Sequence, residues 1–279
     1  MLPTHLDLLR QQVAALEGRP ALALPECGGE GGPERLTLGL DGIDRRLGGG
    51  LVRAGLHEIR SALTRENGAA NGFALAVLAR LTAKDRRPVL WVSERWALAE
   101  AGVPYGPGFL QFGLDPERLI LVETRRPEEA LFAFEEGLAC QGLAAVLGEI
   151  RGNPAVLDLT ASRRLALRAQ QSGVTGLFLH QAGEAEPSAA LTRWRVGPLA
   201  AGTMDGFQKG IGRPAWHLEL ERNRSGAPDR FDVEWDHESR RFTTVAKPAA
   251  LPLARPALPL NRPYSAPDAW PQLALGRTG

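Results

Sequence analysis

Short apolar runs alternate with helical patterns along the middle of the chain, and this alternation constrains the fold most. Four of the runs predict strands, at Pro88–Ser93, Leu119–Glu123, Leu143–Leu147 and Gly176–His180. Helical patterns begin near Gly72 and also cover Glu128–Gln141 and about Ala155–Gln171. Apolar runs separated by helices are typical of strands buried in a parallel sheet. The sequence therefore predicts an α/β fold with a mostly parallel sheet flanked by helices.

The pattern changes after Gln181, where strand-like runs follow one another without intervening helices. These runs are Leu191–Val196, Trp216–Arg222, Phe231–Trp235 and Arg241–Val245. Turn residues such as Asn223–Gly226 separate them, as is typical of antiparallel strands. We therefore expect antiparallel strands added at the C-terminal side of the parallel sheet.

Three regions follow from these patterns. Residues 1–35 combine an amphipathic helix, beginning after Thr4, with a linker rich in glycine and proline. Residues 36–246 form the core domain, and residues 247–279 form a tail with a proline every few residues. Proline at this frequency excludes a regular helix or a central strand, so we expect a flexible tail. Trp270 in this tail is suited to binding a partner protein.

Charge and cysteine content exclude several classes of function. The formal net charge is only +1, so we expect any contact with DNA to be weak or indirect. Cys27 and Cys140 lack the spacing of a disulfide framework or a zinc site, and we expect no metal. The N-terminus does not have the pattern of a signal peptide, and charged residues or glycines interrupt the apolar runs. We therefore expect a cytoplasmic protein without a membrane segment.

The segment Leu36–Ile59 ends in a strand that leads into a loop without nucleotide chemistry. A P-loop ends in Gly-Lys-Ser/Thr, because the lysine reaches the terminal phosphates and the hydroxyl holds magnesium. Residues Arg60–Phe73 contain no lysine. We expect Gly68 and Gly72 to preserve the bend of a degenerate loop that binds no nucleotide, and we expect no cofactor. The alternative is a phosphate held with Thr64 or Arg65 at the start of the following helix.

Two motifs carry a resemblance to a known family. The stretch Glu186–Val196 and the stretch Gly148–Leu167 resemble segments of the ImuA family, which belongs to the RecA superfamily. Segment 36–59 is similar to RecA proteins generally, and the whole resemblance covers roughly residues 36–245. It implies a RecA-like fold and a non-catalytic accessory role in damage-induced, error-prone translesion synthesis. The implied partners are an ImuB-type homologue of Y-family polymerases and an error-prone replicative-type DNA polymerase, with RecA as a further candidate.

The resemblance also implies where a RecA-like nucleotide site would lie. A magnesium-binding acid would close the strand Leu143–Leu147, but Gly148 follows that strand. Glu149 comes one residue later, and alternation along a strand predicts a capping or surface carboxylate there. Glu94 stands near the position of the water-activating glutamate, and Gln181 near that of the glutamine that senses the γ-phosphate. We expect these two residues to be relics of such a site, and the alternative for Glu94 is a strand-end salt bridge or the start of a helix. The loop after Gln181 is short and carries Glu184 and Glu186, and because acidic side chains repel phosphates we do not expect it to capture single-stranded DNA.

A cluster of arginines and one tryptophan is the candidate surface for a partner or for DNA. On a strand, Trp194 faces one side while Arg193 and Arg195 face the other. Arg222 and Arg224 would extend this basic patch. The alternative is that the tryptophan packs in the core and the arginines form ion pairs.

Three functions are compatible with these patterns. The leading hypothesis is an adaptor of translesion synthesis that binds proteins and does not hydrolyse ATP. The second is a DNA-stimulated ATPase of the recombinase class with an atypical P-loop. The third is co-assembly into RecA filaments through the N-terminal helix.

Overall fold

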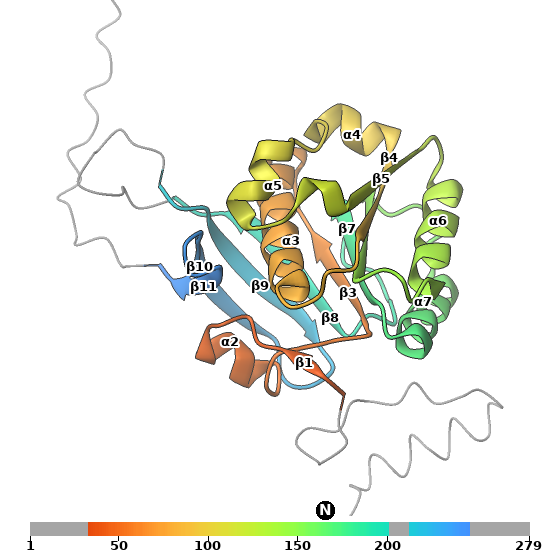
Figure 1. Ribbon diagram of the computed structural model, residues 1–279. Helices are drawn as coiled ribbons and strands as arrows, with labels where there is room; N and C mark the ends of the chain where they lie inside the picture. Colours follow the sequence, from red (N-terminus) through yellow and green to blue (C-terminus); the bar gives the residue numbers. More distant parts are fainter. Residues whose placement is uncertain (1–32, 201–211, 246–279) are drawn as a thin grey trace, which may run out of the picture. The chain divides into compact units, whose positions relative to one another are not determined.

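The computed structural model describes residues 33–200 and 212–245, which build a nine-stranded mixed sheet with helices on both faces (Figure 1). The helix expected after Thr4 and the proline-rich tail with Trp270 lie outside these residues. The strands of the large sheet are β3 (Leu56–Arg60), β4 (Val89–Glu94), β5 (Leu119–Thr124), β6 (Ala145–Arg151), β7 (Thr175–Gln181), β8 (Thr192–Pro198), β9 (Ala215–Asn223), β10 (Asp229–Asp236) and β11 (Arg241–Thr244). A separate pair, β1 (Arg35–Leu36) and β2 (Leu51–Val52), is antiparallel.

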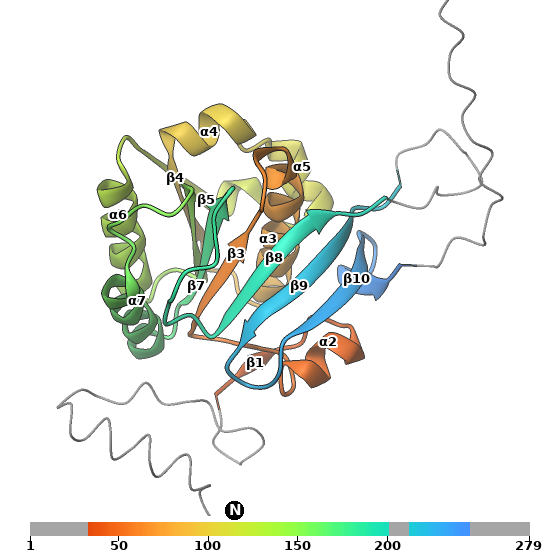
Figure 2. The same cartoon turned by 180° about the vertical axis from the view of Figure 1, so that it is seen from behind.

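The order across the large sheet is β11-β10-β9-β8-β3-β7-β6-β4-β5. The strands from β8 to β5 in this order pair in parallel, whereas β8, β9, β10 and β11 pair antiparallel. The predicted fold class, a mostly parallel sheet with antiparallel strands added at the C-terminal side, is confirmed. In Figure 2 no helix of the described residues crosses the near face of β8, β9 and β10.

The helices are α2 (Asp41–Arg46), α3 (Asn67–Thr82), α4 (Arg95–Ala101), α5 (Gly106–Phe112), α6 (Pro127–Ala139) and α7 (Leu159–Ser172), with short 3-10 turns at Thr64–Glu66 and Pro116–Arg118. Helix α3 begins five residues before Gly72, where we expected its start. Helix α7 begins at Leu159 and not at Ala155, because the Asp158 side chain caps it by accepting from the Ala161 N–H.

The sequence patterns missed the two short helices that follow β4. Glycine and proline between residues 102 and 108 favour a loop, yet α5 forms there. Pro107 stands in the first turn of α5, where its missing N–H removes no intrahelical hydrogen bond. Gly113 then ends the helix in the left-handed conformation that favours glycine.

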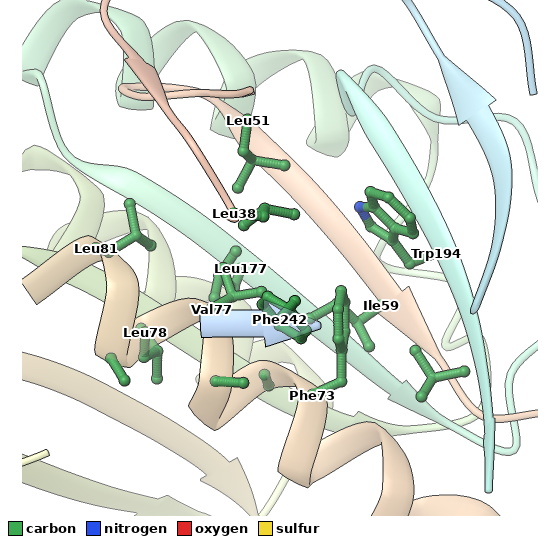
Figure 3. Packing of buried hydrophobic residues seen from close by; sticks show 14 of the residues in the cluster. Leu38, Leu51, Ile59, Phe73, Val77, Leu78, Leu81, Leu177, Trp194 and Phe242 are labelled. Atoms are coloured by element: carbon green, nitrogen blue, oxygen red, sulfur yellow. The ribbon is translucent and has the colours of Figure 1, made fainter. Parts of the chain in front are cut away.

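Helix α3 joins the parallel strands to the antiparallel extension through Phe73 (Figure 3). The centroid of the Phe73 ring lies 5.7 Å from that of the Trp194 ring in β8 and 5.6 Å from that of the Phe242 ring in β11. A buried aromatic cluster of this kind stabilises the fold through its buried apolar surface and through edge-to-face ring contacts. The extension is therefore part of the same hydrophobic core as α3.

A second apolar core lies on the other face of the sheet, beneath α6 and α7. Its centre is an edge-to-face pair of Phe134 and Phe178, with ring centroids 4.9 Å apart. A Cβ atom added at Gly148 in β6 would approach Phe134 to 2.7 Å and Phe178 to 2.9 Å. This position requires glycine because two aromatic rings occupy the space of a side chain.

A buried chain of hydrogen bonds runs through His57 in β3. Trp194 Nε1 donates to Thr192 Oγ1 at 3.1 Å, and Thr192 Oγ1 lies 2.8 Å from His57 Nδ1. His57 Nε2 lies 2.8 Å from the carbonyl oxygen of Val52. A neutral ring that carries its proton on Nε2 satisfies all of these groups. Burial lowers the pKa of His57 to about 4, since an imidazolium here would lose its hydration.

The His57 pKa predicts that stability falls in mild acid. The unfolded chain protonates His57 near pH 6.5, whereas the folded chain does so only near pH 4. The stability contributed by neutral His57 is therefore complete above about pH 6.5 and decreases towards pH 4, by about 3 kcal/mol in total. Urea unfolding at several pH values measures this loss. His57→Gln should flatten the pH dependence, whereas replacement of the more exposed His237 should not; equal pH slopes in the His57 variant and the parent chain would contradict the assignment.

Candidate functional site

The candidate site lies where the parallel strands β3, β4, β6 and β7 end, next to the start of α3. In open α/β sheets, ligands bind beyond the carboxyl ends of the strands. Side chains from four strands and from α3 converge there: Ser61 follows β3, Ser93 lies in β4, Glu149 in β6 and Gln181 in β7, and Asn67 opens α3. Each of these side chains is at most 2% exposed. A polar cluster this deeply buried requires internal hydrogen-bond partners.

Glu149 is the centre of this cluster. Its Oε1 accepts from Asn71 Nδ2 at 3.0 Å and from Gln181 Nε2 at 2.5 Å. Its Oε2 accepts from Trp91 Nε1 at 3.1 Å and from Ser93 Oγ at 2.9 Å. A carboxylate has about four lone-pair positions, so these four donors use its acceptor capacity. Beside it, Asn71 Oδ1 is a buried acceptor that has no hydrogen-bond partner among the described residues.

The expectation that Glu149 is a capping or surface carboxylate is wrong. Alternation along β6 does separate residues 148 and 149, but it is Glu149 that faces α3 and Gly148 that faces the opposite core. An acid at position 148 would have pointed at Phe134 and Phe178. The site therefore retains a carboxylate, held entirely by side-chain donors.

A directed series of hydrogen bonds connects the loop after β3 to this carboxylate. The Ala182 N–H donates to Ser61 Oγ at 2.9 Å, and the Ser61 hydroxyl donates to Asn67 Oδ1. Asn67 Nδ2 donates to Gln181 Oε1 at 3.1 Å, and Gln181 Nε2 donates to Glu149. Gln181 was expected as a relic of a γ-phosphate sensor; in the structure it bridges the loop and the acid by side-chain contacts alone.

The loop between β3 and α3 differs from a P-loop in its residues and in its local structure. Residues 61–66 contain no glycine, and Thr64–Glu66 form a 3-10 turn. The Ala62 N–H donates to the carboxylate of Glu66 at 3.2 Å. The chain thus supplies its own anion next to the start of α3, where backbone donors attract negative charge.

Gly68 and Gly72 lie inside α3, and the expectation that they preserve the bend of the loop is wrong. Asn67 and Gly68 take the first two positions of the helix, where a P-loop has its lysine and its hydroxyl residue. A Cβ atom at Gly72 would lie 3.2 Å from the Trp216 ring, so Gly72 allows close packing of α3 on β9. At Gly68 there is open space.

Glu94 ends β4 and is 5% exposed. Its Oε2 accepts from the Arg151 backbone N–H at 3.3 Å. A general base must reach the proton that it abstracts, and this carboxylate is buried against β6. Its contacts are those of a group that fixes the end of one strand to the next.

The arginine and tryptophan candidates are separated by burial. Trp194 packs in the core with 1% exposure. Arg193 is 8% exposed, and its Nε lies 2.7 Å from Glu58 Oε2, while Arg195 Nη1 lies 2.8 Å from Glu219 Oε2.

Arg222 and Arg224 lie on and just after the neighbouring strand β9. Burial lowers the pKa of the Arg222 guanidinium, and Arg193 nearby lowers it further. Arg224 donates its backbone N–H to Leu191. Whether these residues or Trp270 bind a partner stays a prediction.

Sequence patterns did not identify Ser61, Asn67, Asn71 and Ser93 as site residues. Each is a common polar residue, and only the packing of α3 on the strand ends brings it into the network of Glu149 and Gln181. The usable signal was the position of Ser93 and Gln181 at the ends of predicted buried strands. Within residues 33–200 and 212–245 no cluster of three His, Cys, Asp or Glu residues is arranged to hold a metal ion. In the same residues no helix combines the length and apolarity that a bilayer span requires.

The amino-acid sequence is similar to those of known ImuA proteins. No protein-family model matches the chain. The chain is 37% identical over 206 residues to Protein ImuA of Caulobacter vibrioides strain NA1000 / CB15N, a match that covers 69% of this chain and 80% of that protein. Protein ImuA of strain ATCC 19089 / CIP 103742 / CB 15 gives the same values.

Among solved structures, the crystal structure of the RadB recombinase matches with a TM-score of 0.50 at 16% identity. The match covers 76% of this chain and all of that one, and it supports the fold alone.

The four donors around Glu149 predict the effect of removing its charge. Glu149→Gln introduces an amide NH₂ that faces existing donors, so we expect the free energy of unfolding to fall by about 2–4 kcal/mol. Chemical denaturation measures the change. Glu123→Gln is the control, because Glu123 pairs with Arg95 at an exposed position, and we expect a change within about 0.5 kcal/mol. Equal stability of both variants would show that the Glu149 contacts contribute little.

Proposed function

This chain belongs to the ImuA family, and we propose that it is a non-catalytic, RecA-like adaptor of the DNA damage response and error-prone translesion synthesis. Family membership supports a role in damage-induced mutagenesis. The finer assignment, a protein that binds partners and does not turn over ATP, is our inference from the site.

The observation that carries this proposal is the closed hydrogen-bond network at the ends of the parallel strands. Catalysis of phosphoryl transfer depends on a lysine, a metal ion and a positioned water. Here Asn67 stands at the start of α3 and bonds to Ser61 and Gln181. Glu149 has no acceptor position left, and Glu66 occupies the loop N–H. Binding a triphosphate would break this network, and the loop lacks the lysine and the metal ion whose positive charges would compensate for the lost hydrogen bonds.

Next to this site, α4, α5 and the segment between them expose large apolar side chains. Trp96, Val103, Tyr105 and Leu110 are between 62% and 73% exposed. Figure 1 shows α4 and α5 side by side at the end of the sheet where β4 ends. Aromatic residues with this exposure are typical of protein interfaces. We assign this α4–α5 surface to an ImuB-type homologue of Y-family polymerases, with an error-prone replicative-type polymerase in the same assembly and RecA as a further candidate partner.

The basic residues and the tail complete the proposed contacts. Arg195 has a half-exposed side chain paired with Glu219, and it is the arginine of the cluster best placed to exchange partners at the surface. Trp194 contributes by holding β8 on the core, since it is buried. Trp270 and residues 247–279 remain the proposed second point of attachment.

We expect the chain not to bind ATP. A ligand at 100 times its Kd stabilises a folded chain by about 2.7 kcal/mol, which corresponds to a rise in Tm of roughly 5–10 °C for a chain of this size. We expect millimolar MgATP to leave Tm unchanged relative to magnesium and sodium chloride at equal ionic strength. Micromolar ATP affinity would overturn the adaptor assignment. The alternative, a recombinase-class ATPase, would be established by ATP hydrolysis that requires single-stranded DNA and is lost in Glu94→Gln.

Capture by an ImuB-type protein tests the proposed α4–α5 surface. We expect the full chain to co-purify with an ImuB-type protein, and we expect Trp96→Ala combined with Tyr105→Ala to weaken capture more than tenfold, because truncated interface aromatics often cost 2 kcal/mol or more. Phe132→Ala is the matched control, since Phe132 is an exposed aromatic on α6. Deletion of residues 247–279 should also weaken capture while leaving Tm nearly unchanged.

The capture experiment tests the proposed function and the proposed surface independently. If no variant and no parent chain is captured, the proposed function is wrong. If the parent chain and the α4–α5 variant are captured equally, the function stands and the surface is elsewhere.

A further inference from the structure

Two of the four donors around Glu149 also contact the helices of the α4–α5 surface. The Gln181 amide has two N–H groups, and Nε2 donates to Glu149 Oε1 at 2.5 Å and to the Ala97 carbonyl oxygen in α4 at 3.4 Å. Trp91 Nε1 donates to Glu149 Oε2 at 3.1 Å, and the Trp91 ring meets that of Phe109 in α5 edge to face, with centroids 5.7 Å apart. One carboxylate is therefore connected to both helices, through one side chain each.

The helical residues that receive these contacts are direct neighbours of exposed apolar residues. Ala97 is buried and follows Trp96, which is largely exposed. Phe109 is buried and precedes Leu110, which is also exposed. Successive residues of an α-helix point about 100° apart, so a contact that fixes the buried residue on the core also fixes the direction of its exposed neighbour.

Helix α4 depends on contacts with the core because it is too short to be stable alone. It has seven residues, and isolated helices shorter than about 12–15 residues are marginal in water. Its ion pairs, Arg95 with Glu123 and Glu100 with Arg151, lie at water-accessible positions, where such pairs contribute little. The buried contacts beneath the helix therefore determine its position.

We propose that Gln181 is a positioning residue for partner binding: held by Glu149, it fixes α4 and thereby the direction of Trp96. The proposal rests on the adaptor function, because Trp96 belongs to the surface assigned to the ImuB-type partner. Gln181 and Glu149 are at most 2% exposed, so they act through the helix and do not touch the partner. The network at the strand ends then contributes to protein binding in a chain whose loop lacks the lysine of a P-loop.

Amide hydrogen exchange of the full chain tests the positioning without a partner. Gln181→Met keeps a side chain of similar length and removes the amide, so we expect it to accelerate exchange in α4 at least about fivefold more than in α5, which Trp91 holds, or in α6. Thr175→Val is the control: Thr175 is the first residue of β7, is buried, and accepts from the Ala54 N–H at 3.1 Å. We expect no selective change in α4 for this variant. Equal acceleration in α4, α5 and α6 of Gln181→Met, or none, would overturn the proposal.

Capture by the ImuB-type protein, at a temperature where every variant is folded, tests whether this position matters for binding. We expect Gln181→Met to weaken capture about threefold to tenfold and Thr175→Val to leave it unchanged. In a chain that already carries Trp96→Ala, Gln181→Met should cause no further loss, because both changes act through the same side chain. Unchanged capture of Gln181→Met, or losses that multiply in the double variant, would overturn the proposal. Failure to capture the parent chain would overturn the adaptor function, whereas the exchange experiment contains no partner and decides the positioning of α4 separately.

Discussion

The buried carboxylate of Glu149 is the interaction on which the arrangement of the site depends. It receives hydrogen bonds from α3, β4 and β7 while lying in β6, so one charged group joins four elements. An ionised carboxylate without partners would be costly in this place. With four donors it fixes the relative position of the strand ends, and a nucleotide is not needed for that purpose.

The polar side chains on the two faces of the sheet differ in their hydrogen bonding. On the face of α3, the polar side chains around Glu149 bond to one another, and Asn71 Oδ1 is the buried oxygen there that has no hydrogen-bond partner among the described residues. On the opposite face, Glu58 and His180 retain acceptors that no described residue fills. The fold is similar to that of the RadB recombinase, and Glu58 and His180 lie on its central strands β3 and β7.

Much of the fold was predictable, because apolar runs and turn residues report strand positions directly. The parallel strands and the antiparallel extension came from these patterns, and so did the burial of Trp194 as one of two alternatives. The face of β6 that carries Glu149 was not predictable, since alternation gives opposite faces for residues 148 and 149 but does not say which face α3 covers. Glycine and proline hid helix α5, and Asn67 gained its role only from the packing of α3 beside the end of β7.

The glycine at position 148 has an evolutionary consequence. The rings of Phe134 and Phe178 fill the volume that any side chain at this position would need. A mutation that introduced an acid there would fail before it could be tested for new chemistry, and removing either ring first would open a hole in the core. An acid at this position would therefore need several coordinated substitutions, each harmful alone, so the packing of two rings keeps the residue a glycine.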